Sequence, residues 1–595
     1  MQALQILNDV FGYNSFRSGQ EEIINTLLNK KNILAVMPTG AGKSLCYQIP
    51  ALIFKRGTVV VSPLVALMDD QILSLKEIGV AADRIHSHRT NELNKKTMDN
   101  FKNGKIKILY LSPENLMSDK TLSELRDIDI DMFAIDEAHC ISKWGVSFRP
   151  QYEQLSQLSK IYPDAIIAGF TATADKTTRE DIVSKLSNNN TKIFVQGFDR
   201  PNLSLAVEQK DNWKKQILFF LENKNEASGI IYCLSRKQTE DVSIFLNKNN
   251  YRAIPYHAGQ DSIVRKNNQE TFMNEKGIII VATIAFGMGI NKPDVRFVAH
   301  LSLPSSIEAY YQEIGRAGRD ELPADTLLLY GLNDLFQRRR FIESDGDEVQ
   351  HKLRENKRLD SLLAYCETPT CRKKALLAYF DETINKCNNC DNCLNPPKML
   401  DGTKLAQMAL SAVYRSGQIF GAQHIINILL GNKTEKIIQK NHDKIKTFGI
   451  GSDYKIDFWQ GFIRQLISAG HLIINIKKFG CLQITETGLL ILKDKAYFNY
   501  KEIEAKKTKV SKYNKVKLSL NLDHNDIKIL SALKKIRLNI SKENSIPAFV
   551  IFSDASLLEM ATVKPSNLQE MLKINGVGPS KLKKYGSIFL AAINK

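Results

Sequence analysis

A glycine-rich segment, Met37-Pro-Thr-Gly-Ala-Gly-Lys-Ser44, constrains this chain more than any other feature of its sequence. It follows the apolar run Asn32–Met37 and precedes a helical pattern, which is the setting that a phosphate-binding P-loop requires. The glycines let backbone N–H groups approach phosphate oxygens, and the N-terminus of the helix adds positive potential. We therefore expect the following residues to bind a nucleotide: Thr39, Gly40, Ala41, Gly42, Lys43 and Ser44.

An acidic motif, Asp136-Glu-Ala-His139, stands directly after a second apolar run, Met132–Ile135. Together with a P-loop, such a pair indicates nucleotide hydrolysis. Ser44 and Asp136 are predicted to hold Mg²⁺, and Lys43 to reach the β- and γ-phosphates. Glu137 is predicted to orient and deprotonate the attacking water. The two motifs together predict an NTPase that uses Mg²⁺.

Short apolar runs rich in β-branched residues alternate with helical patterns through the first half of the chain. Besides the two already named, they are Thr58–Ser62, Ile106–Leu111 and Ile166–Phe170, then Gly229–Cys233, Ala253–Tyr256 and Gly277–Ala282. Buried parallel strands with helices on both faces have this pattern. A pause near Phe198–Asn202 separates the two groups. We predict two α/β lobes, residues 1–205 and 206–335.

The second half changes in style and contains a cluster of cysteines. Cys371, Cys387, Cys390 and Cys393 have the spacing C-x15-C-x2-C-x2-C. Four thiolates suit structural Zn²⁺ in tetrahedral geometry, although an iron–sulfur cluster uses the same ligands. Cys366 is expected to be a packed thiol and not a ligand. Around this cluster we predict a helical zinc-binding subdomain at 336–400, a winged helix at 401–492, a lysine-rich linker at 493–517 and a small all-α domain at 518–595.

Composition narrows the function classes. The formal net charge is +18, the sequence pI is about 9.2, and residues 493–517 hold nine lysines and three acids, so a polyanionic partner is expected. No apolar run is long enough to cross a bilayer, and the first residues lack the features of a secretion signal. Nine cysteines in 595 residues do not make a disulfide scaffold. A cytoplasmic protein without a membrane partner is expected.

Further motifs indicate which kind of NTPase this is. Ser62-Pro-Leu, Thr171-Ala-Thr173 and Gln312-Glu-Ile-Gly-Arg-Ala-Gly-Arg319 follow in that order, and the P-loop with Met37 in first position is a variant typical of helicases. The chain thus resembles superfamily 2 helicases, and the resemblance implies a pair of RecA-like motor lobes. Gln312 is then a catalytic-cleft residue. Arg319 is the expected arginine finger and Arg316 a phosphate sensor, on neighbouring sites if the segment is helical.

Two more segments resemble the RecQ family of DNA helicases. In Phe11-Gly-Tyr-Asn-Ser-Phe-Arg-Ser-Gly-Gln20 the resemblance implies that Tyr13 and Arg17 sandwich adenine and that Gln20 reads its edge. Cys140–Tyr152 resembles the aromatic-rich loop that couples DNA contact to hydrolysis. There the implied DNA contacts are Trp144, Phe148 and Arg149. This chain has Val146-Ser147 where the family usually has His-Asp, so the polar groups of that pair are absent here.

The C-terminal half carries the same resemblance. Arg372–Phe380 with Cys387–Cys393 is similar to the RecQ zinc-binding subdomain, and residues 420–451 to its winged helix. Lys477 and Lys478 form the expected wing. Phe479 is a candidate strand-separating residue, although a buried aromatic at the tip of the wing has the same pattern. The final segment resembles the family's HRDC domain. Its turn Ile574-Asn-Gly-Val-Gly-Pro-Ser-Lys581 places Lys581 where it would meet a DNA phosphate, although a plain helix start has the same pattern.

The resemblance implies an ATP-dependent DNA helicase that moves 3′ to 5′ on single-stranded DNA and unwinds duplexes in repair and recombination. It implies ATP, Mg²⁺ and Zn²⁺ as cofactors, single-stranded and duplex DNA as partners, and association with the nucleoid. Single-stranded-DNA-binding protein and other repair factors are candidate protein partners. Two alternatives stay open at this point. One is a superfamily 2 RNA helicase or translocase, and the other a non-catalytic zinc and winged-helix DNA-binding protein.

Overall fold

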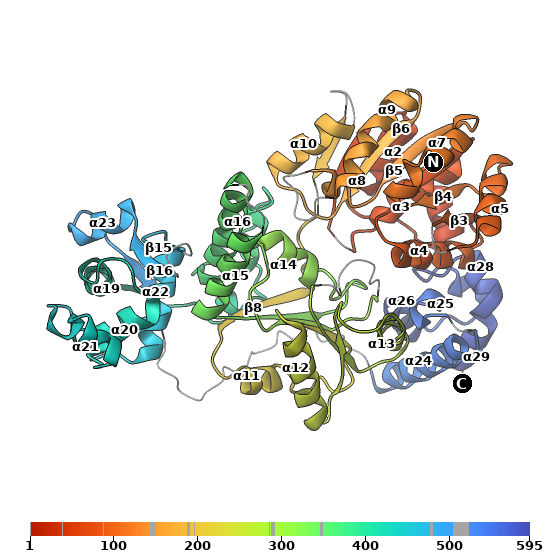
Figure 1. Cartoon of the computed structure of the whole chain (residues 1–595). Coiled ribbons are helices and arrows are strands. Elements are labelled where there is room, and N and C mark those ends of the chain that lie inside the picture. Colours follow the sequence, from red (N-terminus) through yellow and green to blue (C-terminus); the bar gives the residue numbers. More distant parts are fainter. Residues whose placement is uncertain are drawn as a thin grey trace.

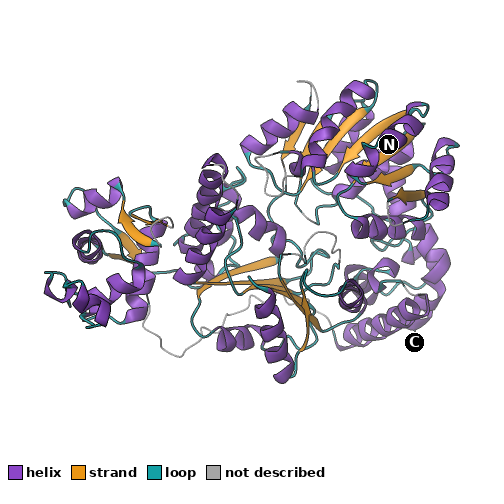
Figure 2. Cartoon of the chain, in the orientation of Figure 1, coloured by secondary structure: helices purple, strands orange, loops and turns teal. Residues whose placement is uncertain are grey.

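The structure of the chain is a computed structural model (Figures 1 and 2). It describes residues 2–38, 40–86, 89–142, 149–186, 191–195, 197–284, 286, 292–345, 349–475, 480–503, 523–544 and 546–594. Two sheets covered by helices make up the motor part. Smaller domains lie at either end of them in Figure 1, with the cyan winged helix on one side and the blue C-terminal domain on the other.

Lobe 1 is built on a parallel sheet whose seven described strands have the order β3-β4-β2-β5-β6-β1-β7. Its strands are β1 Ile33–Val36, β2 Gly57–Val61, β3 Ala82–Ile85, β4 Ile108–Leu111, β5 Ile130–Ile135, β6 Ile166–Thr171 and β7 Lys192–Val195. Its main helices are α2 Gln20–Leu28, α3 Lys43–Ile53, α4 Val65–Glu77, α5 Asn91–Lys102, α7 Asp119–Arg126 and α10 Lys176–Leu186. The apolar runs predicted as strands between residues 32 and 170 all contribute to this sheet. Edge strands β3 and β7 were not predicted, because β3 carries Asp83 and Arg84 in place of an apolar run and β7 has only three apolar residues after Lys192.

Lobe 2 has a second parallel sheet of six described strands in the order β10-β11-β9-β12-β13-β8. Its strands are β8 Leu203–Gln209, β9 Gly229–Tyr232, β10 Arg252–Tyr256, β11 Ile278–Ala282, β12 Phe297–His300 and β13 Ala324–Tyr330. Helices α11 Trp213–Leu221, α12 Arg236–Lys248, α13 Ser262–Asn274 and α14 Ile307–Ile314 accompany it. The boundary predicted at residue 205 falls inside β8, because the pairing of β8 with β13 already begins at Leu203.

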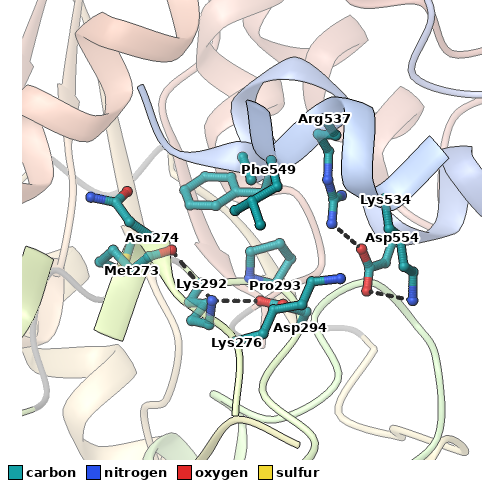
Figure 3. Close-up of a pocket in the computed structure, with 12 residues that line it drawn as sticks. Met273, Asn274, Lys276, Lys292, Pro293, Asp294, Lys534, Arg537, Phe549 and Asp554 are labelled. Carbon is teal, nitrogen blue, oxygen red and sulfur yellow. Dashed lines mark hydrogen bonds and ion pairs between the residues drawn. The ribbon is translucent and has the colours of Figure 1, made fainter. Parts of the chain in front are cut away.

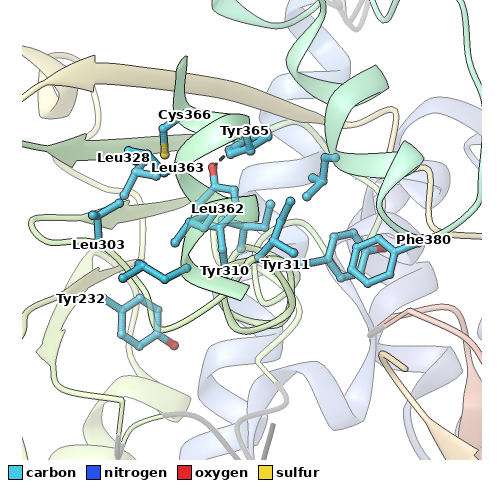
Figure 4. Packing of buried hydrophobic residues seen from close by; sticks show 14 of the residues in the cluster. Tyr232, Leu303, Tyr310, Tyr311, Leu328, Leu362, Leu363, Tyr365, Cys366 and Phe380 are labelled. Atoms are coloured by element: carbon cyan, nitrogen blue, oxygen red, sulfur yellow. Dashed lines mark hydrogen bonds between the residues drawn. The ribbon is translucent and has the colours of Figure 1, made fainter. Parts of the chain in front are cut away.

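The zinc-binding subdomain extends lobe 2. It contains α15 Leu332–Ser344, α16 Val349–Glu367, α17 Arg372–Ala378 and α18 Asp391–Leu394. Cys390 forms a parallel bridge with Leu205 of β8, and the backbone N–H of Val207 donates to Asp391. Tyr310 and Tyr311 of α14 pack against Leu362, Tyr365 and Phe380 of the subdomain in one apolar cluster (Figure 4). The subdomain is therefore continuous with the core of lobe 2.

The winged helix follows, with α19 Thr403–Arg415, α20 Ala422–Leu430, α21 Glu435–Gln439, α22 Ile456–Ser468, α23 Glu486–Leu492 and the hairpin β15 Leu472–Asn475 and β16 Cys481–Ile484. Strands β15 and β16 pair in antiparallel fashion. One prediction is wrong, since the linker does not begin at residue 493. Strand β17, Asn499–Lys501, pairs with β14, Met399–Asp401, and buries Tyr500 against α22. This stretch is rich in lysine but alternates with aromatic residues, and its pairing closes the domain.

The C-terminal domain is helical and bridges both lobes (Figure 1). It consists of α24 His524–Asn544, α25 Ala548–Ile551, α26 Asp554–Val563, α27 Leu568–Met571, α28 Pro579–Lys581 and α29 Ser587–Ile593. Toward lobe 2, Arg537, Phe549 and Asp554 line a small hollow with Lys276 and Asp294 (Figure 3). None of the predicted site residues lines this hollow. Among the described residues, no helix is long and apolar enough to span a membrane.

Candidate nucleotide, zinc and DNA sites

The P-loop connects β1 to α3 in the manner that its sequence predicts. Gly40 and Gly42 have φ angles of 90° and 80°, a left-handed region that side chains with a Cβ atom rarely adopt. A Cβ atom on Gly42 would lie 2.4 Å from the amide nitrogen of Gln20. The ammonium of Lys43 donates to the carbonyl of Met37 at 3.2 Å. Burial lowers the pKa of Lys43, and the nearby carboxylates of Glu137 and Asp136 oppose that shift.

The acidic pair lies at the end of β5, beside the P-loop. Burial, together with the charge of Glu137, raises the pKa of Asp136 to about 7. Glu137 has a φ of 50°, so its backbone is held in a strained left-handed conformation. His139 accompanies the pair, since its Nδ1 lies 2.8 Å from Oγ1 of Thr171 and 3.3 Å from Oε2 of Glu137. The arrangement concentrates negative charge next to Lys43.

The expected adenine-binding residues contact the P-loop. Arg17 donates to the carbonyl of Gly40 and forms an ion pair with Glu321 of lobe 2 at 2.7 Å. Gln20 is buried, and its amide donates to the carbonyls of Ala41 and Gly42 at 3.1 and 3.2 Å. Its oxygen accepts the backbone N–H of Arg17. Tyr13 is 40% exposed and so has a ring face open to a ligand. In this conformation Gln20 supports the P-loop, and its contact with adenine stays a prediction.

Lobe 2 brings its arginines to the same cleft. Helix α14 ends at Ile314, so Arg316 and Arg319 lie in the turn that follows and not on one helical face. Gln312 reaches across and donates to Oγ1 of Thr173 in lobe 1 at 2.7 Å. A Cβ atom on Gly40 would lie 3.6 Å from Cγ of Arg319. The arginine turn thus faces the P-loop across the cleft between the lobes.

The cleft residues fit a magnesium-bound triphosphate. Burial and the positive charges of Arg316 and Arg200 lower the pKa of Arg319, which means that these cations repel one another. A polyanion between them would remove that cost. Nε of Arg316 and Oε2 of Glu137 are buried polar atoms without hydrogen-bond partners among the described residues. A divalent cation at Asp136 would equally offset its unfavourable burial, so Ser44 and Asp136 would hold Mg²⁺.

The four predicted zinc ligands converge. The sulfur atoms of Cys371, Cys387, Cys390 and Cys393 all lie within 4.8 Å of one another. Backbone N–H groups of Arg372, Lys374 and Asn389 donate to three of these sulfurs, which favours the thiolate form. Cys366 is buried outside this group, as expected for a packed thiol. Four thiolates leave no open coordination position, so the metal supports the fold.

A buried ion pair beside the zinc site was not predicted from the sequence. Arg372 is 1% exposed, and its guanidinium binds both carboxylate oxygens of Asp391. It also donates to the carbonyls of Tyr365 and Cys366. Asp391 in turn accepts the N–H of Val207 in β8. The position of both residues next to ligand cysteines was a signal that could have been used, because zinc ligands need such support.

Most of the predicted DNA contacts lie outside the described residues, and so does Thr39 of the P-loop. The predicted DNA contacts outside the described residues are Trp144, Phe148, Lys477 and Lys478. Val146, Ser147 and Phe479 also lie outside them. Arg149 is described, and it donates to the carbonyl of Pro63 in the Ser62-Pro-Leu motif at 3.2 Å. This contact ties the start of α8, Pro150–Glu153, to the loop after β2. The DNA contact of Arg149 stays a prediction.

The structure places Lys581 differently from the prediction. The turn before α28 docks on lobe 1, where the N–H of Gly576 donates to the carbonyl of Gly12 at 2.7 Å. Ser580 donates to the carbonyl of Ile78, and Lys584 pairs with Glu77 at 2.9 Å. Lys581 is half-buried in this interface, so burial lowers its pKa to about 8. A DNA phosphate would reach this turn only if the interface opened.

The family models that match this chain do so in the order of the domains described above. Residues 17–182 match the DEAD/DEAH box helicase family model and 209–321 the helicase conserved C-terminal domain. Residues 332–394 match RecQ zinc-binding, 396–509 the RQC domain and 526–593 the HRDC domain. The chain is 42% identical to "ATP-dependent DNA helicase RecQ" of Haemophilus influenzae over 598 residues, which is 100% of this chain and 96% of that protein. The chain belongs to the RecQ family of ATP-dependent DNA helicases.

Other RecQ relatives agree along the whole chain. The protein of the same name from Pasteurella multocida is 40% identical and covers 100% of this chain and 94% of its own length. The Bacillus subtilis protein is 36% identical, with coverage of 100% and 98%. Membership of the RecQ family confirms the ATP and Mg²⁺ requirement and the zinc site. It also sets aside the reading of the chain as a non-catalytic DNA-binding protein.

Proposed function

We propose that this RecQ helicase couples ATP hydrolysis in the cleft between its lobes to 3′-to-5′ movement along single-stranded DNA, and so unwinds duplexes during DNA repair and recombination. The observation that carries the proposal is that helicase motifs of lobe 1 and lobe 2 contact each other across one cleft. Gln312 donates to Thr173 at 2.7 Å, and Arg17 pairs with Glu321 at 2.7 Å. A ligand that alters these contacts changes the relation of the lobes.

Each cleft residue has a role in this proposal. Lys43 neutralises the β- and γ-phosphates, and Glu137 accepts a proton from the attacking water. Ser44 and Asp136 would hold Mg²⁺, which would supply neutralisation of the phosphate charge. Arg319 stabilises charge on the transferred phosphoryl group, while Arg316 senses the γ-phosphate. Gln312 links the state of the nucleotide to Thr173 on the opposite lobe.

The DNA-handling roles rest on family resemblance and charge. The aromatic-rich loop with Arg149 would contact the single strand, and the winged helix would hold the duplex. The net charge of +18 favours a phosphate backbone as partner, so binding should weaken steeply with salt. Nucleoid association and contacts with single-stranded-DNA-binding protein belong to the same proposal.

Replacing Glu137 tests the assigned chemistry. Glu137→Gln keeps the shape of the side chain but removes the base, so DNA-stimulated hydrolysis should fall by about 10²- to 10⁴-fold. Binding of a fluorescent ATP analogue should persist. Glu92→Gln makes the same substitution at an exposed position in α5, so it is the matched control and should leave turnover unchanged. Near-normal turnover of Glu137→Gln would refute the role given to this carboxylate.

Substrate and polarity need a separate experiment. Unwinding is measured on duplexes with a 3′ tail or a 5′ tail, and ATP turnover is measured with single-stranded DNA or RNA. The proposal expects unwinding from the 3′ tail alone and stronger stimulation by DNA. Unwinding from the 5′ tail would refute the direction, and a clear preference for RNA would restore the RNA-helicase alternative.

A further inference from the structure

The segment that joins the two lobes, Phe198–Asn202, carries an arginine with no role in the reaction described so far. Nη2 of Arg200 donates to the carbonyls of Ala317 and Gly318, at 3.1 and 2.7 Å. These are the two residues directly before Arg319. Asn202 adds a second hydrogen bond to the carbonyl of Gly318, at 2.9 Å. The arginine turn is thus bound through its backbone by the connection between the lobes.

Arg200 also lies against the P-loop. A Cβ atom on Gly40 would lie 3.3 Å from Nη1 of Arg200 and 3.6 Å from Cγ of Arg319. One nitrogen of the planar guanidinium therefore binds the arginine turn while the other faces the phosphate-binding loop. A guanidinium offers several donors in a fixed fork, which suits such a double contact. We propose that Arg200 is a positioning residue that holds the turn of Arg319 at the distance from the P-loop that hydrolysis requires.

The zinc-binding subdomain fixes the position of Arg200. Lys373, next but one after the ligand Cys371, is 4% exposed and donates to the carbonyl of Arg200 at 2.8 Å. It also pairs with Asp199 at 3.1 Å. These contacts join the helix that begins at the zinc site to the backbone of the connection. The metal site thereby supports the geometry of the nucleotide cleft without touching a substrate.

Aromatic packing reinforces this arrangement. The ring of Phe198 stacks on Phe380 at 4.5 Å and 4°, and the backbone N–H of Phe198 donates to Glu382 at 2.9 Å. Tyr311 of α14 donates to the carbonyl of Phe198 at 2.8 Å. Figure 4 shows Tyr311 and Phe380 side by side in this cluster. The residues around Arg200 are held from lobe 2 and from the zinc-binding subdomain together.

The inference rests on the proposed role of Arg319, so the experiment includes both residues. Arg200→Gln should lower kcat of DNA-stimulated ATP hydrolysis by about 10- to 100-fold, as misplaced catalytic groups do. The KM for ATP and the Tm should change little. Arg200→Lys keeps one donor for the two carbonyls and should recover part of the lost kcat. It is also the variant measured if Arg200→Gln does not fold.

A double variant decides whether Arg200 acts through Arg319. Arg319→Ala alone should lose about 10³-fold or more in kcat. If Arg200 only positions Arg319, adding Arg200→Gln to Arg319→Ala causes no further loss. Losses that multiply would overturn the inference and make Arg200 an independent phosphate ligand. Normal turnover of Arg319→Ala would refute the role of Arg319 as arginine finger. If Arg319→Ala is inactive but Arg200→Gln has normal turnover, only the inference about Arg200 is refuted.

The link to the zinc-binding subdomain has its own matched pair of variants. Lys373→Met removes the contacts with the Arg200 carbonyl and with Asp199, whereas Lys374→Met changes an exposed neighbour on the same helix. We expect kcat to fall about 3- to 10-fold in Lys373→Met alone, as loss of one buried charged hydrogen bond implies. Elemental analysis should show full zinc content in both. Wild-type kcat in Lys373→Met would overturn this part of the inference.

Discussion

Two turns in this helicase share a Gly-x-Gly pattern followed by a lysine, but they differ in what surrounds them. Gly40-Ala-Gly42-Lys43 and Gly576-Val-Gly578-Pro-Ser-Lys581 each precede a helix, and each predicts a phosphate site by its donors and lysine. Around the first, carboxylates, arginines and the half-buried Lys43 converge on the cleft between the lobes. The second is covered, because its Gly576 N–H is bound by the Gly12 carbonyl of lobe 1. A turn of this kind specifies free donors, but tertiary contacts decide what they bind.

The largest expected difference between the two turns lies in their lysines. Lys43→Ala removes the cation from the phosphate site and should reduce ATP hydrolysis by at least about 10²-fold. Lys581→Ala should leave hydrolysis within about 2-fold of wild type, because its side chain faces lobe 1. Steady-state phosphate release with single-stranded DNA measures both. A large loss in Lys581→Ala would contradict the comparison by giving the second turn a part in hydrolysis.

Adding a methyl group to each turn gives a smaller and more local test. Gly42→Ala requires a left-handed alanine, and its Cβ would lie 2.4 Å from Gln20, so ATP binding should be lost. Gly578 has an ordinary φ of −86°, and a Cβ there would lie 3.1 Å from the Val10 carbonyl. Gly578→Ala should therefore loosen the docked domain and leave the Tm of the lobes unchanged. Energy transfer between labels at exposed Leu93 and Ile588 measures the docking.

The control for this pair is the wild-type chain carrying the same two labels. Gly42→Ala should keep the wild-type energy transfer, because its effect is confined to the nucleotide cleft. Unchanged energy transfer in Gly578→Ala would show that the interface tolerates the extra methyl group. The docked arrangement would then depend on contacts other than the close approach of Gly578 to the chain at Val10.

Sequence alone predicted the parts of this molecule that are determined by local patterns. Strands β1, β2, β4, β5 and β6 are buried on both faces and so appear as continuous apolar runs. Edge strands β3 and β7 have one neighbour each and are partly exposed, so neither appears as a long apolar run, and both were missed. The zinc ligands followed from the spacing of cysteines. The P-loop and the acidic pair followed from their places after apolar runs.

Contacts between distant segments were beyond prediction from one sequence. Gln20 bonds to the P-loop and Arg200 to the arginine turn, and in both cases the partners are joined only by the fold. The strand pair β14 and β17 joins residues on either side of the winged helix, so residues 499–501 were mistaken for linker. Lysine content indicated solvent there, whereas burial of Tyr500 against α22 determined the structure.

The smallest expected effect is a pH dependence of docking. Burial, and more weakly the charge of Lys584, lower the pKa of Lys581 to about 8 in the docked domain, although Glu77 opposes the shift. An undocked Lys581 keeps its ordinary value near 10.4. Between these values the undocked form binds more protons, so docking should strengthen as pH rises through 8 and be weakest below it. The gain is at most about tenfold per pH unit.

Energy transfer between the labels at Leu93 and Ile588 measures this gain from pH 7 to pH 9.5. The wild-type signal should increase over the upper part of that range. Lys581→Met carries no titrating group at this position and should show a flat profile, while Lys583→Met, an exposed neighbour, should behave as wild type. An equal increase in Lys581→Met would assign the effect to another group. A decrease in the wild type would contradict the burial of Lys581 in the interface and reopen the second turn as a phosphate site.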